Sequence, residues 1–84
     1  MRSIAIEAQR RLLERRQDLV GLLEKLSASE LKDLREIDSA LQRLEMSTYG
    51  RCERCDAAIG RLRLQAIPEA RHCLACAGQQ EVDA

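Results

Sequence analysis

The chain has 84 residues and carries 14 basic and 14 acidic side chains, so its formal net charge is zero. Tyr49 is its single aromatic residue, which argues against a thick globular core and favours helices packed side by side through leucine. A neutral chain without stacking aromatics is also poorly suited to nucleic acid, because phosphate contacts need cations and base stacking needs aromatic rings.

Residues 3–26 are predicted to form the first helix. Apolar side chains recur along it at steps of three and four, which places them on one face. Gly21 is a mild weakness inside the helix, and the stripe is interrupted near Arg15 and Arg16. The stripe consists of Ile4, Ala5, Ala8, Leu12, Leu19, Leu22, Leu23 and Leu26.

A second helix is predicted over residues 30–47, after a polar turn at residues 27–30. Ser27 and Glu30 match a capping box, and Ser29 is an alternative N-cap. A short connection makes the two helices antiparallel neighbours. The apolar positions of the second helix follow the rhythm of a coiled coil; they are Leu31, Leu34, Ile37, Leu41 and Leu44.

Four cysteines follow as Cys52-x2-Cys55-x17-Cys73-x2-Cys76. Two C-x2-C pairs separated by about 15 to 20 residues are typical of a tetrahedral zinc site. Each pair forms a tight turn that directs two sulfurs at one point, and four thiolates close the coordination shell. We therefore predict one structural zinc ion bound by these four cysteines.

Two other uses of the cysteines compete with zinc. A pair of disulfides is typical of small secreted domains, but the first residues lack the apolar segment of a secretory signal. A redox-active C-x2-C needs a βαβ context that the chain does not predict. No apolar run reaches the roughly 20 residues of a membrane span. The expectation is a reduced, cytoplasmic metalloprotein without membrane association.

Residues 58–64 alternate apolar and basic side chains, which favours a short two-stranded β-ribbon between the cysteine pairs. Residues 75–81 are predicted to form a short C-terminal helix. His72 is expected to stay outside the metal shell, which four thiolates already complete. The residues expected to form a small core around the metal are Ile59, Leu62, Leu64, Ile67 and Leu74.

Arg61 and Arg63 are expected to project from this ribbon. Neutralising Glu53, Asp56 and Glu69 is the plainer explanation for them. Contact with an acidic partner is the alternative.

The predicted fold class is mainly α. An antiparallel helical hairpin (a coiled coil) occupies residues 1–48, with its tip at about residues 27–30. A small four-cysteine zinc finger with a short β-ribbon and a C-terminal helix occupies residues 49–84. Gly50 allows the sharp bend between the two parts. The seam of the hairpin also allows self-pairing, so a monomer or a weak dimer is expected.

The chain resembles the DksA/TraR family of bacterial regulators over roughly residues 30–80. The motifs are Tyr49-Gly50-Arg51-Cys52-Glu53-Arg54-Cys55, then Ile59-Gly60-Arg61-Leu62-Arg63-Leu64-Gln65-Ala66-Ile67-Pro68, and then the second cysteine pair. The resemblance implies a protein that binds RNA polymerase directly rather than DNA. It implies a coiled coil inserted into the secondary channel of the polymerase, a zinc end at the channel rim, and often a joint action with ppGpp.

The hairpin tip departs from the family pattern. Family members that act at the polymerase active site carry an Asp-x-x-Asp-x-Ala motif at the tip or near the N-terminus, and this chain has it at neither place. Glu30 and Asp33 are the acids near the predicted tip. Together with Lys32, Arg61 and Arg63, they are the candidate partner-binding residues.

The same comparison weakens the basis for a ppGpp role. The positions at which the family places basic contacts fall near Ser29, Lys32 and Glu36, and only Lys32 is basic. Ala77 stands where a basic residue is expected just after the last cysteine.

We therefore expect a transcription regulator that binds RNA polymerase, with weak or altered activity because the acidic motif is missing. A zinc-stapled adaptor that binds another protein through its helical hairpin is the alternative. A nucleic-acid-binding zinc ribbon is a third hypothesis, against which the neutral charge argues. An enzyme is not expected, because the metal shell is closed and no catalytic constellation is visible.

Overall fold

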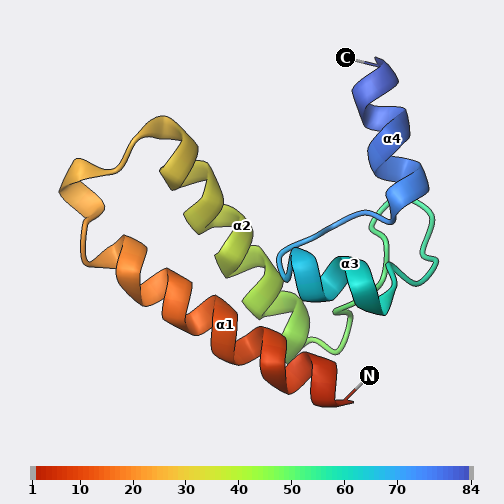
Figure 1. Ribbon diagram of the computed structural model, residues 1–84, viewed down its shortest axis with the longest axis horizontal. Helices are drawn as coiled ribbons and strands as arrows, with labels where there is room; N and C mark the ends of the chain where they lie inside the picture. The colour runs from red at the N-terminus through yellow and green to blue at the C-terminus, as the bar shows by residue number, and fades with distance from the viewer. Residues whose placement is uncertain (1, 84) are drawn as a thin grey trace.

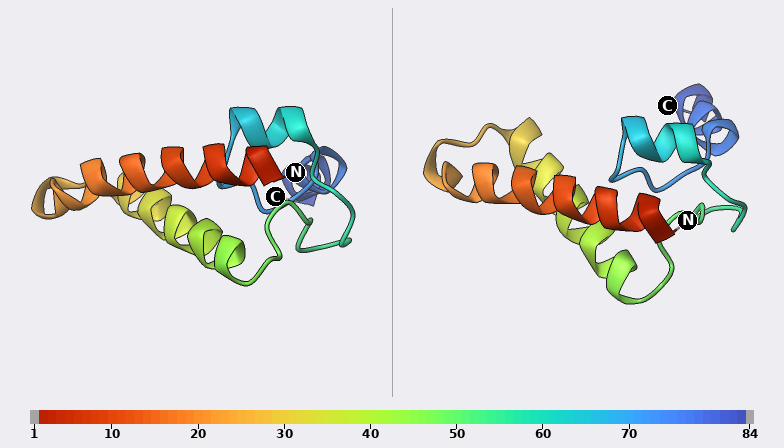
Figure 2. Two further views of the ribbon diagram at one scale, coloured as in Figure 1. Left: turned by 90° about the horizontal axis from the view of Figure 1, so that it is seen from below. Right: turned by 60° about the horizontal axis from the view of Figure 1, so that its bottom comes forward.

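The computed structural model describes the backbone of residues 2–83 and the side chains of residues 3–78. In chain order its elements are α1 (Arg2–Val20), a 3₁₀ turn (Leu23–Lys25), α2 (Ala28–Glu45), α3 (Arg61–Ala66) and α4 (Leu74–Asp83). α1 and α2 form a hairpin, and the chain then folds back so that α3 lies beside the N-terminal part of α1 (Figure 1, Figure 2). α4 points away from the hairpin. The mainly α fold class is confirmed.

The hairpin turns earlier than predicted. The connection between α1 and α2 spans residues 21–27, so the predicted tip at residues 27–30 lies too far along the chain. Gly21 has a low helix propensity, and α1 ends just before it. Leu22 and Leu23, predicted to continue the buried stripe, are therefore on the tip and are each 54% exposed.

The start of α2 confirms the predicted capping box. The backbone N–H of Glu30 donates to Ser27 Oγ at 3.2 Å, and the backbone N–H of Ser27 donates to Glu30 Oε1 at 3.1 Å. These two bonds satisfy donors that a helix start otherwise leaves without partners. Ser27 is the N-cap, and Ser29 lies inside α2.

The hairpin core is built from small and branched side chains. Ala40 is fully buried, which allows α1 and α2 to approach closely. Three of its five buried residues belong to the stripe predicted for α1. The buried residues of this hairpin core are Ala8, Leu12, Leu19, Ile37 and Ala40.

A second core forms around the cysteines and includes one residue of α1. The buried residues of this finger core are Ile4, Cys52, Ile59, Leu64, Ala70 and Cys76. Tyr49 packs against both cores, and its hydroxyl donates to the carbonyl oxygen of Pro68 at 2.8 Å. Burial raises the pKa of Tyr49. Hairpin and finger therefore share packing, and their division at residues 48 and 49 stays a prediction.

The predicted β-ribbon is wrong. Residues 61–66 form the helix α3, and the one bridge found among the described residues joins Arg51 to Ala58. The segment contains Arg, Leu, Gln and Ala, all strong helix formers without branching at Cβ. Gly60 precedes the helix with φ = 106°, a conformation that favours glycine.

The helix α3 also changes which side chains reach the core. Ile59 and Leu64 are buried as predicted, but Leu62 is 80% exposed. Ile67 and Leu74 are exposed too, so these three predicted core residues are corrected. In the part of the chain that the structure describes, no helix combines the length and the apolar character that crossing a membrane requires.

Candidate metal centre

Two chain turns carry the cysteines. The first follows Gly50, whose φ of 89° lets the backbone bend sharply. The backbone N–H of Asp56 donates to the carbonyl of Cys52 at 2.9 Å, and the backbone N–H of Cys52 donates to the carbonyl of Ala57 at 2.8 Å. These bonds close the first turn and hold its two thiols on one side.

The second cysteine pair lies at the start of α4. The backbone N–H of Ala77 donates to the carbonyl of Cys73 at 2.9 Å, and the backbone N–H of Glu53 donates to the carbonyl of Arg71 at 2.9 Å. The second bond ties the two turns to each other. The sulfurs of both pairs therefore face the same point.

The geometry of the four thiols suits one zinc ion. Their sulfur atoms all lie within 4.8 Å of one another, and the Sγ atoms of Cys55 and Cys73 are 3.8 Å apart. Four thiolates around one zinc, each at about 2.3 Å in a tetrahedron, need sulfur separations of about 3.8 Å. All four cysteines are free of disulfides. His72 stays outside the group of metal-ligating residues found in the described part of the chain.

The protein environment favours ionisation of Cys52 over that of Cys55 and Cys76. Burial opposes ionisation of Cys52, but backbone N–H groups, first that of Cys73, outweigh burial and lower the pKa of Cys52 to about 6. Burial and the neighbouring thiols raise the pKa of Cys76 to about 12. For Cys55 the backbone N–H of Ala57 lowers the pKa, but the Cys52 side chain and burial together raise it. Because metal ligation requires thiolates, zinc binding at this site displaces protons.

Comparisons with known proteins agree with this geometry. The model of the prokaryotic dksA/traR C4-type zinc finger family matches residues 47–81. A solved structure from Chlamydia trachomatis, described as the RNA polymerase binding protein and transcriptional regulator Dks, is similar with a TM-score of 0.81 and 31% sequence identity. The similarity covers 99% of this chain and 93% of that chain. The chain belongs to the DksA/TraR family. A comparison with curated proteins found no match.

Membership of the DksA/TraR family and the sulfur geometry together identify the site as a four-cysteine centre for one structural zinc ion. Two of its cysteines, Cys52 and Cys76, are buried in the finger core, whereas Cys55 is exposed. Zinc bound there links the first turn to α4 and contributes directly to folding.

The candidate partner-binding residues do not form one surface. Glu30, Lys32 and Asp33 lie at the start of α2 beside the tip, whereas Arg61 and Arg63 lie in α3 at the other end of the molecule (Figure 1). The Glu30 side chain is engaged in the capping box, and backbone hydrogen bonding to Ser27 lowers its pKa. Lys32 is exposed and Asp33 is half-buried.

Among the described residues, the two arginines of α3 form no ion pair with Glu53, Asp56 or Glu69, and their contact with an acidic partner stays a prediction. Arg63 Nε donates to the carbonyl of His72 at 2.9 Å, so Arg63 supports the second cysteine turn. Two acids of the finger pair with other arginines. Asp56 pairs with Arg51 at 3.6 Å, and Glu53 pairs with Arg43 and Arg71. Arg61 is exposed.

A charge network that sequence reasoning missed joins α2 to the finger. Arg71 pairs with Glu36 of α2 and, at 3.2 Å, with Glu53 of the first cysteine turn. Glu53 also pairs with Arg43 of α2 at 3.5 Å. No sequence spacing signals these pairs, because their members lie between 10 and 35 residues apart.

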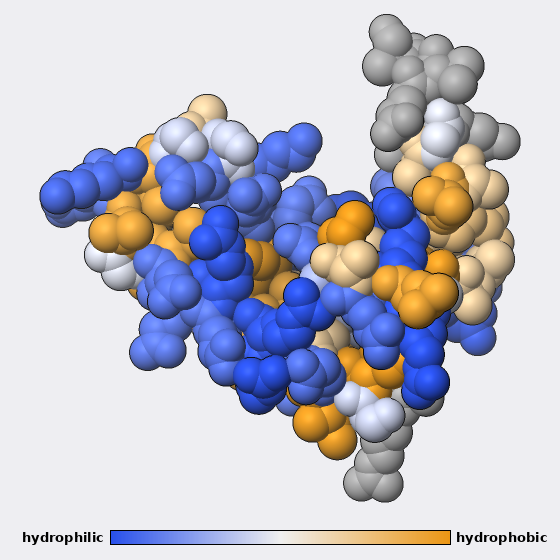
Figure 3. Space-filling view, viewed as in Figure 1, coloured by the Kyte–Doolittle hydropathy of each residue, from blue (hydrophilic) through white to orange (hydrophobic). Residues whose placement is uncertain are grey.

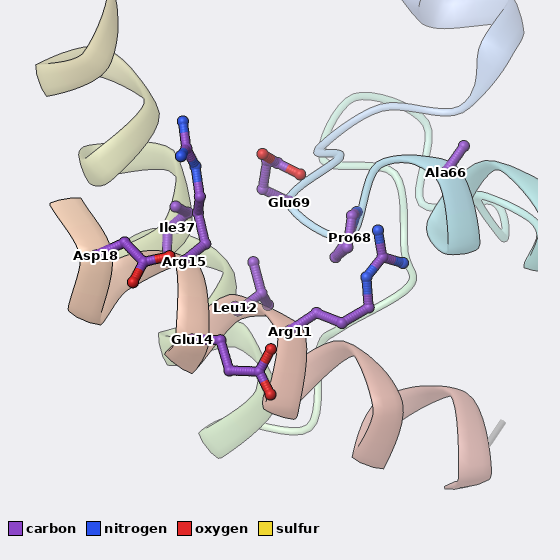
Figure 4. Close-up of a pocket in the computed structure, with 9 residues that line it drawn as sticks. All are labelled: Arg11, Leu12, Glu14, Arg15, Asp18, Ile37, Ala66, Pro68 and Glu69. Carbon is purple, nitrogen blue, oxygen red and sulfur yellow. The ribbon is translucent and has the colours of Figure 1, made fainter.

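A cavity of about 390 Å³ separates the hairpin from the finger. Figure 4 shows Arg11 and Arg15 of α1 and Glu69 of the segment after α3 around this space, above Leu12 of α1. Its lining mixes two arginines with three carboxylates, so the cavity selects for neither anions nor cations. Arg11 donates to the carbonyl of Gln65, which connects α1 to α3 across the edge of the cavity.

Proposed function

We propose that this protein is a transcription regulator that binds bacterial RNA polymerase directly, through the secondary channel, rather than DNA. The observation that carries the proposal is the similarity to the Chlamydia protein, which extends over the hairpin and the finger together. A shared zinc finger alone supports a shared fold. Here the arm and the finger are both shared with a protein that is described as RNA polymerase binding, and this supports a shared partner.

The arrangement of the molecule fits this role. The hairpin extends away from the finger, with the tip at its far end (Figure 2). α2 has 18 residues and is therefore about 27 Å long. The network of Arg71, Glu36 and Glu53 ties the middle of α2 to the finger. A rigid arm is suited to insertion into a channel, with the four-cysteine centre holding zinc at the rim.

The chemistry of the tip supports an altered activity. Apolar surface gathers at the tip end of the hairpin (Figure 3), where Val20, Leu22 and Leu23 are exposed. Carboxylates are the groups that interact with the metal ions of a polymerase active site, and leucines do not replace them. We propose that the protein occupies the channel, affects initiation weakly or differently, and competes with relatives that carry the acidic motif.

The described contacts also argue against joint action with ppGpp. Glu36 occupies one of the positions at which the family resemblance implies a basic contact, and its carboxylate pairs with Arg71. An anionic nucleotide needs cations at such positions. The neutral net charge likewise argues against direct binding to nucleic acid. The proposed role is that of a binding protein of the cytoplasm, not of an enzyme.

An adaptor that binds another protein through its hairpin is the second candidate. The exposed leucines of the tip favour it, since exposed apolar side chains fit an apolar groove on a partner. The two candidates share the fold and differ in the partner.

The test is binding of the zinc-loaded protein to purified bacterial RNA polymerase, with a DksA-type protein added as competitor. We expect a complex that the competitor displaces. The double variant Leu22→Asp/Leu23→Asp alters the inserted tip. It should therefore change how well the protein competes with the DksA-type protein for polymerase, or change the protein's effect on transcription. Leu62→Asp is the matched control on exposed α3, away from the tip. Absence of a complex at micromolar concentration would reject polymerase binding and favour the adaptor.

A further inference from the structure

α1 carries two apolar stripes, and only one of them packs inside the molecule. The first contributes Ile4, Ala8, Leu12 and Leu19 to the two cores. The second consists of Ile6, Leu13 and Val20, which are 61%, 49% and 42% exposed. At 100° per residue these three side chains lie within about 40° of one another, on the side of α1 away from the buried stripe.

The second stripe lies on an open edge of the molecule. α2 and α3 pack on the other sides of α1, and no element of the described chain covers its outer edge (Figure 1, Figure 2). We call Ile6, Leu13 and Val20 the outer stripe. Spacing by seven residues repeats every two helical turns, which is the repeat of helices that pair along their length.

The sequence around the outer stripe is nearly palindromic, with Leu13 at its centre. Ile6 and Val20 lie seven residues on either side of Leu13. A glutamine lies four residues away on each side, at positions 9 and 17, and an arginine three residues away on each side, at positions 10 and 16. A two-fold symmetric contact requires that residue i meet residue j while j meets i. Any helix that pairs antiparallel with its own copy meets this requirement, so the sequence around Leu13 matters for which side chains then meet: apolar side chains face apolar ones, and each arginine lies beside a glutamine.

The charges of this face are compatible with such a pair. Arg10 is paired within the chain to Glu7 at 2.7 Å and to Glu14 at 2.9 Å. Arg16 is paired to Asp38 of α2 at 2.6 Å. Each arginine therefore brings its own counter-charge to the contact, and repulsion between copies is small.

We propose that α1 pairs antiparallel with α1 of a second copy of this chain, around a two-fold axis at Leu13. Leu13 then meets Leu13 of the second copy, and Ile6 meets its Val20. On the helix flanks, Arg10 lies beside Gln17 of the second copy, whose amide oxygen can accept its hydrogen bond. The proposal goes beyond the proposed function and does not depend on it.

The contact is expected to be weak. From Ile6 to Val20 the stripe is about 21 Å long and one side chain wide, so it buries less than the roughly 800 Å² per partner of a standard interface. A dimer of this kind forms at high local concentration and dissociates on dilution. Its two tips point in opposite directions.

Sedimentation velocity on the zinc-loaded full chain tests the proposal, from micromolar to millimolar concentration. We expect a concentration-dependent dimer. Leu13→Lys places two ammonium groups opposite each other at the two-fold axis, which should weaken dimerisation at least about tenfold. Leu62→Lys makes the same exchange at an exposed leucine off the stripe and should leave dimerisation unchanged. Circular dichroism checks that both variants fold.

A charge-reversal experiment isolates the two-fold axis. Leu13→Glu alone should also be monomeric, and an equal mixture of Leu13→Glu with Leu13→Lys should recover the dimer, because opposite charges then face each other. The double variant Ile6→Glu/Val20→Lys should still dimerise in the antiparallel arrangement and should fail in a parallel one. A wild-type chain that stays monomeric at millimolar concentration would overturn the proposal, as would a dimer that Leu13→Lys does not weaken.

Discussion

Arg43 of α2 is the buried charge that connects the hairpin to the finger. It is 8% exposed, and burial lowers its pKa although the carboxylate of Glu53 opposes this shift. Its guanidinium donates to Ser39 Oγ at 2.9 Å and to the carbonyls of Glu69 and Ala70, each at 3.3 Å. Its Nε is buried without a hydrogen-bond partner in the described part of the chain. The two carbonyls belong to the loop before the second cysteine turn, so Arg43 positions that turn.

We expect Arg43→Met to destabilise the protein by about 2–4 kcal/mol, because the carbonyls of Glu69 and Ala70 lose their donor, whereas Glu53 keeps its pairing with Arg71. Urea unfolding followed by circular dichroism measures this change. Arg35→Met is the matched control, since Arg35 is exposed on the same helix and its replacement should change stability by less than about 0.5 kcal/mol. Equal effects of the two substitutions would contradict the role assigned to Arg43.

At the scale of elements, the start of α2 depends on its capping box. Ser27→Ala removes the acceptor for the backbone N–H of Glu30 and should cost about 1 kcal/mol. For a chain of this size that corresponds to a fall in Tm of about 4–8 °C. Thermal unfolding measures it. Ser29→Ala, within the first turn of the same helix, is the control and should leave Tm unchanged or slightly higher, because Ala is the stronger helix former. If the capping box does not contribute to stability, the Ser27→Ala and Ser29→Ala variants will have the same Tm.

The element that sequence reasoning misassigned is α3. The alternation of Leu62 and Leu64 with arginines over a few residues fits a strand and a short helix equally well, as short patterns do. Packing decides between them. The backbone N–H of Leu64 donates to the carbonyl of Gly60 at 3.1 Å, which begins the helix. Leu64 then reaches the finger core, while Leu62 points outward.

At the scale of the whole molecule, the zinc centre and the base of the hairpin are one packed unit. Ile4 of α1 lies in the same core as Cys52 and Cys76. A change at the metal site therefore also affects the packing of α1.

Removal of zinc should unfold residues 50–78 and loosen the first turns of α1. The reason is that metal-binding free energy is folding free energy in so small a core. Hydrogen exchange after chelation should show lost protection at both places, with protection retained around Leu19 and Ile37 of the hairpin core. Cys76→Ser should reproduce this pattern. A finger that still resists protease after chelation would contradict the account.

Lowering the pH should also release zinc, because protons compete with the metal for the thiolates. Because the pKa of Cys55 is raised and that of Cys76 is raised to about 12, both thiols hold protons at neutral pH and must release them to bind metal. Displacement of two protons makes the apparent zinc affinity fall by at least about 100-fold for each unit that the pH is lowered. Below about pH 6 Cys52 takes up a proton as well, and the apparent zinc affinity then falls more steeply with decreasing pH. A colorimetric chelator titration at several pH values measures this slope.

The sequence by itself determined the parts that depend on local pattern. The spacing of the four cysteines predicts their convergence, since each C-x2-C turn directs its own two sulfurs. The capping box at Ser27 and the apolar periodicity of α2 are equally local. Only the tertiary structure decided which leucine of α3 is buried and how Arg43 and Arg71 pair with Glu53. Those features depend on which distant segments meet, and burial against a distant partner outweighs the small local preferences that a sequence pattern records.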